Sequence, residues 1–348
     1  MNELYLITAL LHKRKSVGKL SMGKKTKVQK AAISQESIGP KAKYRVRNWV
    51  TYNESLKKRG SITIWIDEDA LRAWKPVSRE VRERGGQKLY SDGAIECLLL
   101  VKAVYHLPYR QTEGFAESLN QMLGLALRIP DYTTLNRRAK TLKVKLPTRE
   151  KGGIHAVLDS TGLKVYGEGE WKVRQHGYSK RRTWRKLHLG VDEATGEIEA
   201  VVLTEASVDD AEVVEELLKQ IKSKVKQMSG DGAYDKDKVY EAAAAQGVIC
   251  ITIPPRRDAV FWKENGSDPH PRNLNLLRIK EIGRKDWKKK SGYHRRSLAE
   301  TAMFRFKTIF GDHLCARETE RQKTEARVKC AALNRMTRLG MPESYRLD

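Results

Sequence analysis

The sequence has few of the residues that build cross-linked, zinc-stapled or membrane-bound proteins. It contains four cysteines, Cys97, Cys250, Cys315 and Cys330, and no C-x-x-C pair, which argues against a structural zinc site and a disulfide framework. No apolar run approaches the ~20 residues that a membrane-spanning helix needs. The apolar stretch 4–11 is followed by basic residues, which reverses the charge order of a secretory signal. We therefore expect a cytoplasmic protein with no membrane partner.

Acidic residues are also scarce relative to basic ones. The 348 residues include 68 Lys or Arg against 43 Asp or Glu, a formal charge of +25. The excess is uneven, because residues 1–60 carry 15 basic against 3 acidic side chains and residues 271–296 carry 10 against 2. Clustered Lys and Arg release counterions from nucleic acid on binding, so the composition predicts a nucleic-acid partner.

The chain begins with a segment that shows no pattern of a folded domain. Residues 1–43 are rich in Lys, Ser and Gly and have little hydrophobic periodicity, so we expect a basic, disordered arm. Within it, Met22 opens a stretch that resembles a natural translation start. We therefore expect residues 1–21 to come from an upstream start codon and to add nothing to the fold.

Residues 44–149 show mainly helical periodicity and are expected to form a DNA-binding region. Ser91 or Asp92 is suited to cap an apolar helix that extends to Tyr105. Another helix is predicted to start near Asp131 and has the Asn and Arg content of a helix that reads a major groove. Its candidate DNA-binding residues are Arg137, Arg138 and Lys140.

The helix predicted near Asp131 also has a plainer interpretation as a charged surface helix. The connection from Leu123 to Asp131 is longer than the three or four residues of a tight helix-turn-helix. The pattern is therefore helix-turn-helix-like, and it does not by itself select one of the two roles.

After Pro147 the pattern changes to alternating strands and helices. Residues 154–159 are typical of a buried strand that ends in a carboxylate, and residues 184–191 and 198–203 predict a hairpin. The complete order of strands and helices is that of a ribonuclease H-like α/β domain, a mixed sheet flanked by helices, which we place at residues 150–340. We expect residues 254–275 to form a long loop and residues 341–348 a tail.

The stretch from Tyr293 to Lys307 combines an apolar stripe with an unusual polar one. On an α-helix, Tyr293, Arg296, Glu300 and Lys307 share one face, because their spacings of three, four and seven are helical repeats. A carboxylate suits a hard metal ion, and the flanking phenol and cations suit phosphate. A solvated helix face with an ordinary ion pair accounts equally well for these residues when they are taken alone.

Three acids stand out by their positions in the predicted elements. Asp159 follows the first strand, Asp231 follows the fourth, and Glu300 is on the late helix. Each has a bland interpretation alone, as a polar strand end, a turn former or a surface charge. Together they can supply the oxygen ligands that a pair of metal ions ~4 Å apart requires. Such a pair activates a water or a 3′-hydroxyl toward a phosphodiester.

With these residues in view, the chain resembles the DDE transposases of bacterial insertion sequences, in the insertion sequence five family of the four/five superfamily. The resemblance rests on Y-(2)-R-(3)-E-(6)-K from Tyr293 to Lys307, on D-S-T at Asp159 and on D-G-A-Y at Asp231. It extends over most of the chain from residue 44. The Asp231 to Glu300 interval is short for members that carry a large β insertion, so hairpin-forming functions of that insertion are not expected.

The resemblance implies that Asp159, Asp231 and Glu300 bind two Mg²⁺ or Mn²⁺ ions and catalyse cleavage at transposon ends and joining to target DNA. It implies that Tyr293, Arg296 and Lys307 contact the phosphates of the end, and that a homodimer or larger oligomer forms at synapsis. The implied partner is double-stranded DNA, and the implied location is the nucleoid. Two other interpretations stay open: a ribonuclease H-like nuclease without strand transfer, and an inactive, domesticated DNA-binding protein. Trp262 and Trp287 are expected to pack against protein rather than to stack on an unpaired base.

Overall fold

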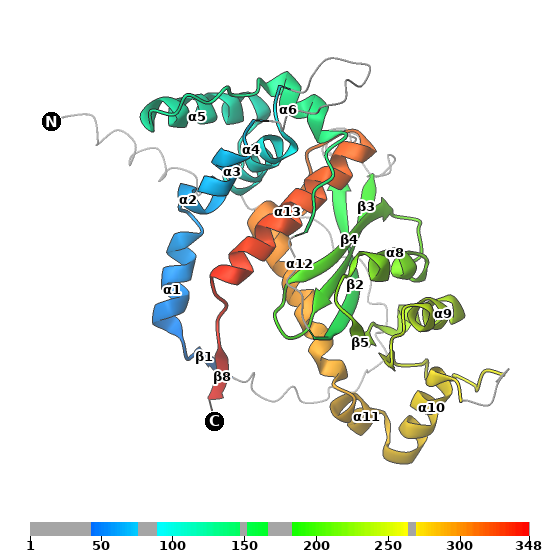
Figure 1. Ribbon diagram of the computed structural model, residues 1–348. Coiled ribbons are helices and arrows are strands. Elements are labelled where there is room, and N and C mark those ends of the chain that lie inside the picture. The colour runs from blue at the N-terminus through cyan, green and yellow to red at the C-terminus, as the bar shows by residue number, and fades with distance from the viewer. Residues whose placement is uncertain (1–42, 76–88, 147–151, 166–182, 264–268, 348) are drawn as a thin grey trace, which may run out of the picture. The chain divides into compact units, whose positions relative to one another are not determined.

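The computed structural model describes residues 43–75, 89–146, 152–165, 183–263 and 269–347 (Figure 1). The expected basic arm lies outside these ranges except for its last residue, and so does the proposed upstream extension. The chain divides into two compact units, residues 1–45 with 345–348, and residues 46–344. Strands β1 (Lys43–Val46) and β8 (Ser344–Leu347) pair with each other, so the expected C-terminal tail contains a strand.

The larger unit is built on a mixed sheet with the strand order β4-β3-β2-β5-β6, and β7 pairs with β2 beside this path. The β2-β3 and β3-β4 pairs are antiparallel, whereas β2-β5 and β5-β6 are parallel. This topology confirms the predicted ribonuclease H-like fold class. The strands are β2 (Ile154–Val165), β3 (Trp184–Asp192), β4 (Ile198–Glu205), β5 (Val225–Ser229), β6 (Cys250–Thr252) and β7 (His313–Leu314).

The predicted hairpin is confirmed, and the residues of its turn favour a reversal of the chain. Gly196 has φ +69°, a backbone conformation that favours glycine. The Thr195 hydroxyl donates to Asp192 Oδ2 at 2.7 Å, so the turn fixes its own side chains. β3 and β4 are buried along most of their length because both faces of the sheet are covered.

One face of the sheet packs against η1, α8 and α9, and the other against α12 and α13 (Figure 1). Asp209 caps η1 by accepting from the Ala211 amide at 3.0 Å. The elements that follow β4 are η1 (Asp210–Val213), α8 (Val214–Gln220), η2 (Gly232–Tyr234), α9 (Asp237–Ala245), α10 (Pro271–Ile282), α11 (Arg284–Lys290), η3 (Tyr293–Arg296), α12 (Ser297–Phe310) and α13 (Thr319–Leu339).

The region before the sheet is helical, as predicted. Its helices are α1 (Trp49–Lys58), α2 (Ile62–Trp65), α3 (Glu68–Arg72), α4 (Asp92–Val104), α5 (Tyr109–Met122) and α6 (Tyr132–Ala139). Ser91 caps α4 by accepting from the Ala94 amide at 2.9 Å, and Asp131 caps α6 by accepting from the amides of Thr133 and Thr134. Both caps lie at the predicted positions.

One hydrophobic core runs through both the helical region and the sheet. Leu98 on α4, Leu135 on α6, Leu189 on β3 and Leu333 on α13 belong to the same buried cluster. The final basic helix of the sequence, α13, is thus a central packing element. Its Asn334 side chain both donates to and accepts from the Ile198 backbone at 2.8 Å, which ties the helix to the start of β4.

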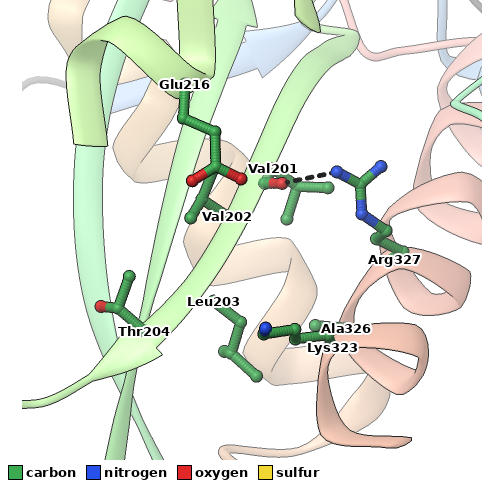
Figure 2. Close-up of a pocket in the computed structure, with 8 residues that line it drawn as sticks. All are labelled: Val201, Val202, Leu203, Thr204, Glu216, Lys323, Ala326 and Arg327. Carbon is green, nitrogen blue, oxygen red and sulfur yellow. Dashed lines mark hydrogen bonds between the residues drawn. The ribbon is translucent and has the colours of Figure 1, made fainter. Parts of the chain in front are cut away.

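At Val201 the outer edge of β4 is covered by the side chains of Gln220 and Arg327, and Figure 2 shows the bond from Arg327 to the Val201 carbonyl. Gln220 forms hydrogen bonds with both the amide and the carbonyl of Val201 at 3.2 Å, and Arg327 donates to the same carbonyl at 3.3 Å. A cavity of about 260 Å³ lies alongside, lined in part by Glu216 and Lys323. These contacts satisfy an edge that would otherwise be open to pairing with another strand.

The expected loop between β6 and the Tyr293 helix is shorter than predicted, and that boundary was wrong. α10 begins at Pro271, a residue whose fixed φ suits a first helical position, and His270 Nδ1 accepts from the Arg272 amide at 3.2 Å. In the part of the chain that the structure describes, no helix is long and apolar enough to cross a membrane.

Candidate active site

Asp159 lies on β2, and Asp231 follows β5, the strand beside it. β2 and β5 are parallel with Val157 opposite Ser229, so two further residues along each chain bring Asp159 beside Asp231. The prediction that β2 ends at Asp159 was wrong. The strand continues to Val165 because β3 pairs with it through Lys164. β5 ends at Ser229, which leaves one side of Asp159 without a strand neighbour.

Asp231 is held by the turn that follows β5. It caps η2, and its Oδ1 accepts from the Ala233 amide at 2.8 Å. β5 ends two residues before the acid. Asp231 is thus outside the sheet, with one carboxylate oxygen oriented by its own backbone.

Glu300 lies on the first turn of α12, a helix that packs against the sheet. The predicted helix from Tyr293 is confirmed for Ser297–Phe310, but its first turn is the 3₁₀ element η3, which starts after Gly292 at φ +72°. Ala302 and Phe306 are buried against the sheet, as the apolar stripe predicted. Glu300, on the polar side, is about half exposed.

Arg296 joins the acids of the sheet and the helix. Its Nη1 is 3.2 Å from Asp159 Oδ2, and its Nη2 donates to Glu300 Oε1. The Tyr293 ring centroid is 5.9 Å from the same guanidinium. The structure therefore gathers Asp159, Glu300, Arg296 and Tyr293, four of the predicted site residues, around one cation.

The charges of the site act on one another. Burial raises the pKa of Asp159, the negative charges of Asp231 and Glu300 act in the same direction, and the Ser160 amide and Arg296 oppose them. Burial disfavours the charged form of Arg296, yet the surrounding acidic groups outweigh it and raise its pKa. The three acids are 72 and 69 residues apart in sequence, and the β2-β5 register and the contacts of Arg296 bring them to one region of the fold.

The donor chemistry of this site suits a hard divalent cation. All three acids offer carboxylate oxygens, and the partly buried Asp159 gains from any added positive charge. Within the described ranges, no three His, Cys, Asp or Glu side chains already converge as a metal site. The guanidinium of Arg296 contacts Asp159 Oδ2 and Glu300 Oε1, so a metal ion that binds these two oxygens would displace it.

The remaining predicted residues lie at some remove from this arrangement. Lys307 is partly buried on α12, two helical turns after Glu300. On α6, Arg137 is exposed, Lys140 pairs with Glu318 at 2.5 Å, and Arg138 pairs with Asp92. Among the described residues, no contact of these three α6 cations reaches the acidic site.

Aromatic and polar residues around the site divide into expected and overlooked ones. Trp287 is 2% exposed, and its ring centroid lies 6.2 Å from that of Tyr293, so the expectation of packing is confirmed. Trp262 packs edge-on against Tyr240 at 5.4 Å.

Sequence reasoning overlooked Tyr234 and His188, which are buried near the site. The D-G-A-Y motif contained Tyr234, but only burial distinguishes it.

Two family models and a solved structure match this chain. Two family models described as "Transposase DDE domain" match residues 57–168 and 150–335, and the second spans more than half of the chain. Among solved structures, the piggyBac transposase synaptic complex with hairpin DNA is 12% identical, with 79% of this chain and 73% of that chain covered and a TM-score of 0.33. On the strength of the match to residues 150–335, the chain belongs to the transposase DDE domain family.

Proposed function

We propose that the protein is an insertion-sequence transposase that binds terminal inverted repeats, cleaves them by two-metal phosphodiester hydrolysis and joins the 3′-hydroxyl to target DNA. The observation that carries this proposal is that Arg296 bridges Asp159 on β2 and Glu300 on α12, while Asp231 follows the neighbouring strand β5. The chain's large positive charge supports a DNA substrate.

Asp159, Asp231 and Glu300 would hold the two Mg²⁺ or Mn²⁺ ions. When bound, such ions supply Lewis-acid stabilisation and lower the pKa of the attacking hydroxyl or water. The protein's part is to present the oxygens from rigid elements. The Ala233 amide orients Asp231, the Ser160 amide orients Asp159 at 2.9 Å, and α12 fixes Glu300 through its buried face.

In this proposal Arg296 binds the acids in the absence of DNA and a phosphate in its presence. Without DNA it neutralises Asp159 and Glu300, and it becomes available to a phosphate of the transposon end once cations take over those carboxylates. Tyr293 and Lys307 belong to the same polar stripe and would contact neighbouring phosphates. The YREK residues thereby couple DNA binding to the charge state of the acids.

A basic surface leads to this stripe. α11 ends in Lys288, Lys289 and Lys290, directly before η3, and Lys288 Nζ lies 4.9 Å from the Tyr293 ring centroid. The buried Trp287 anchors α11 to the body of the unit. A DNA backbone that follows these lysines would arrive at Tyr293 and Arg296.

The finer features of the proposal follow the resemblance to the insertion sequence five family. We assign residues 44–149 to recognition of the inverted repeat, with Arg137, Arg138 and Lys140 on the candidate helix α6. We further propose that at least two protomers pair two ends at synapsis, and that the protein acts at the bacterial nucleoid.

The deciding experiment uses purified protein, Mg²⁺ or Mn²⁺ and the DNA that flanks its own gene, with end cleavage and joining to a plasmid both scored. Asp231→Asn and Glu300→Gln are expected to abolish both reactions while DNA binding stays nearly intact. Asp258→Asn, which alters an exposed loop acid, serves as the matched control.

Three outcomes would count against the proposal. Cleavage without joining in the unaltered protein would favour a nuclease, and binding without cleavage would favour an inactive descendant. Cleavage retained by Glu300→Gln would overturn the assignment of Glu300 as a metal ligand.

A further inference from the structure

A loop that follows β6, residues 253–263, runs beside the turn of Asp231. Its first three residues, one isoleucine and two prolines, are buried, and the chain then reaches the surface at the exposed Arg256. A Cβ added to Gly232, the residue after Asp231, would lie 3.5 Å from the Pro254 carbonyl oxygen. The arginine therefore emerges two residues after the point at which the loop approaches the turn of the acid.

Side chains of α10 and α11 fix the backbone of this loop. Arg284 donates to the carbonyls of Pro255 and Arg256 at 2.7 and 3.1 Å. Asn273, which is 2% exposed, donates to the Trp262 carbonyl at 2.9 Å and accepts from the Trp262 amide at 3.0 Å. Arg256 is thus carried on an ordered backbone, as a side chain that binds a ligand requires.

A buried ion pair joins the loop to the turn of the acid. Arg272 Nε lies 2.8 Å from Asp235 Oδ1, and these side chains are 6% and 4% exposed. Arg272 Nη1 also donates to the Val260 carbonyl of the loop at 2.8 Å. Asp235 comes directly after η2, the element that Asp231 caps. A buried ion pair is weak evidence for stability, but this one fixes the loop relative to the turn.

A cavity of about 450 Å³ lies between the loop and the turn, and its lining includes Gly232 and Arg256. The other charged residues of the lining form two ion pairs, Asp235 with Arg272 and Asp209 with Lys236. Among the described residues, the Arg256 guanidinium has neither a hydrogen bond nor an ion pair. The lining therefore carries one uncompensated positive charge, which favours an anionic occupant.

A phosphodiester group suits this cavity by charge, shape and size. The planar guanidinium offers a fork of N–H donors that can pair with two phosphate oxygens. The volume falls within the range of about 300–1,000 Å³ that is usual for ligand sites. The Trp262 ring already packs against Arg272 at 4.1 Å and against Tyr240 at 5.4 Å, which favours a phosphate over a stacked base as the occupant.

We propose that Arg256 binds a backbone phosphate of the DNA strand that passes Asp231. Arg296 contacts Asp159 and Glu300 and is assigned to the transposon end, whereas the cavity of Arg256 borders the turn of Asp231. Arg256 therefore suits the DNA on the other side of the reacting phosphate. Flanking DNA and target DNA both present this chemistry. The inference rests on the proposed function, since it takes Asp231 as part of the catalytic site.

The test compares Arg256→Gln with Arg257→Gln in the full-length protein. The two arginines are adjacent and exposed, but of the two Arg256 lines the cavity. Fluorescence anisotropy without metal measures binding to the transposon end, with and without flanking DNA. Single-turnover assays with Mn²⁺ measure cleavage of the uncut end and joining of a precut end to a plasmid. Calorimetric Tm checks that each variant is folded.

We expect Arg256→Gln to keep its Tm and its affinity for the end without flanking DNA. Cleavage or joining should slow by about tenfold or more, because a charge-assisted contact with phosphate is lost. Arg256→Lys, which keeps the charge without the fork, should recover part of the rate, and Arg257→Gln should behave like the unaltered protein. Slower cleavage with weaker binding of flanked ends identifies flanking DNA as the ligand, and slower joining identifies target DNA.

Three results overturn the inference alone, provided that the unaltered protein cleaves and joins. They are unchanged rates in Arg256→Gln, an equal loss in Arg257→Gln, and a loss of affinity for the end without flanking DNA that matches the loss for the flanked end. If the unaltered protein neither cleaves nor joins its DNA, the proposed function fails and the inference falls with it.

Discussion

At the residue scale, two adjacent arginines of η3 have different partners. The guanidinium of Arg296 contacts Asp159 and Glu300, whereas that of Arg295 contacts Glu193. Both side chains carry the same charge on the same 3₁₀ turn. They therefore separate the effect of a countercharge inside the site from the general effect of positive charge near it.

Arg296→Gln is expected to tighten Mn²⁺ binding in the DNA-free protein severalfold, because a competing cation is removed from two ligands. It should also weaken binding to the transposon end and reduce the salt slope of log K by about one. Titration calorimetry and fluorescence anisotropy at several salt concentrations provide the two readouts. Arg295→Gln is the control, and equal Mn²⁺ affinities in the two variants would contradict a direct role of Arg296 among the acids.

His188 gives a second prediction, one about pH. Burial lowers its pKa to about 4 from an ordinary value of 6.5, so the folded protein holds the imidazole neutral. A depressed histidine pKa means that stability is fully present above pH 6.5 and is lost as the pH falls toward 4. At pH 5 the loss from this residue is about 2 kcal/mol. His188→Gln should therefore show a smaller fall in the free energy of unfolding between pH 7 and pH 5 than the unaltered protein, and parallel curves would contradict the assignment.

The three acids illustrate what sequence supports at this scale. Asp159 and Asp231 follow apolar strand patterns and Glu300 lies on an amphipathic stripe, so position alone selects them. Tyr234 and His188 carry no such periodic signal. Their importance comes from burial and from neighbours that are distant in sequence, which only the fold establishes.

At the element scale, the cap of α6 depends on residues that are neighbours in sequence, whereas its packing depends on distant ones. Asp131 caps it as expected, because the acid precedes the helix in sequence and the contact is local. Its packing is not local: Arg321 of α13 donates to the Asn136 carbonyl at 3.0 Å, and Arg138 donates to the Tyr90 carbonyl at 3.0 Å. β2 is longer than predicted for the same reason: its pairing partner β3 lies beyond residue 182, and local sequence does not identify distant partners.

The two arginines of α6 should separate stability from DNA binding. The Arg138 side chain is 13% exposed and paired with Asp92, so Arg138→Ala is expected to lower the free energy of unfolding by about 2 kcal/mol. The exposed Arg137 should contribute little to stability, and Arg137→Ala should instead weaken end binding and reduce the salt slope by about one. Denaturant melts and anisotropy titrations measure the two effects. If Arg137→Ala lowers stability and leaves end binding unchanged, α6 is not part of the DNA interface.

At the scale of the whole molecule, composition and pattern indicated two regions, and the core joins them. The change from helical to alternating patterning near Pro147 is real, as α6 precedes and β2 follows it. Periodicity shows which side of an element is apolar, but it does not identify the partner that covers that side. Leu98, Leu135 and Leu333 are distant in sequence, and their shared cluster emerges only in three dimensions.

This shared core predicts that residues 150–348 will not fold alone. Without α4 and α6, the buried faces of α13 and α12 would be exposed, and burial of each large apolar side chain contributes roughly 1.5–3 kcal/mol. The fragment is expected to bind a hydrophobic dye and to lack a cooperative thermal transition. Residues 44–348, which keep both helices, should melt in a single transition, as one domain does. A fragment 150–348 that unfolds cooperatively with native near-ultraviolet dichroism would show that the sheet and its own helices suffice, and that α4 and α6 are a removable attachment to the catalytic fold.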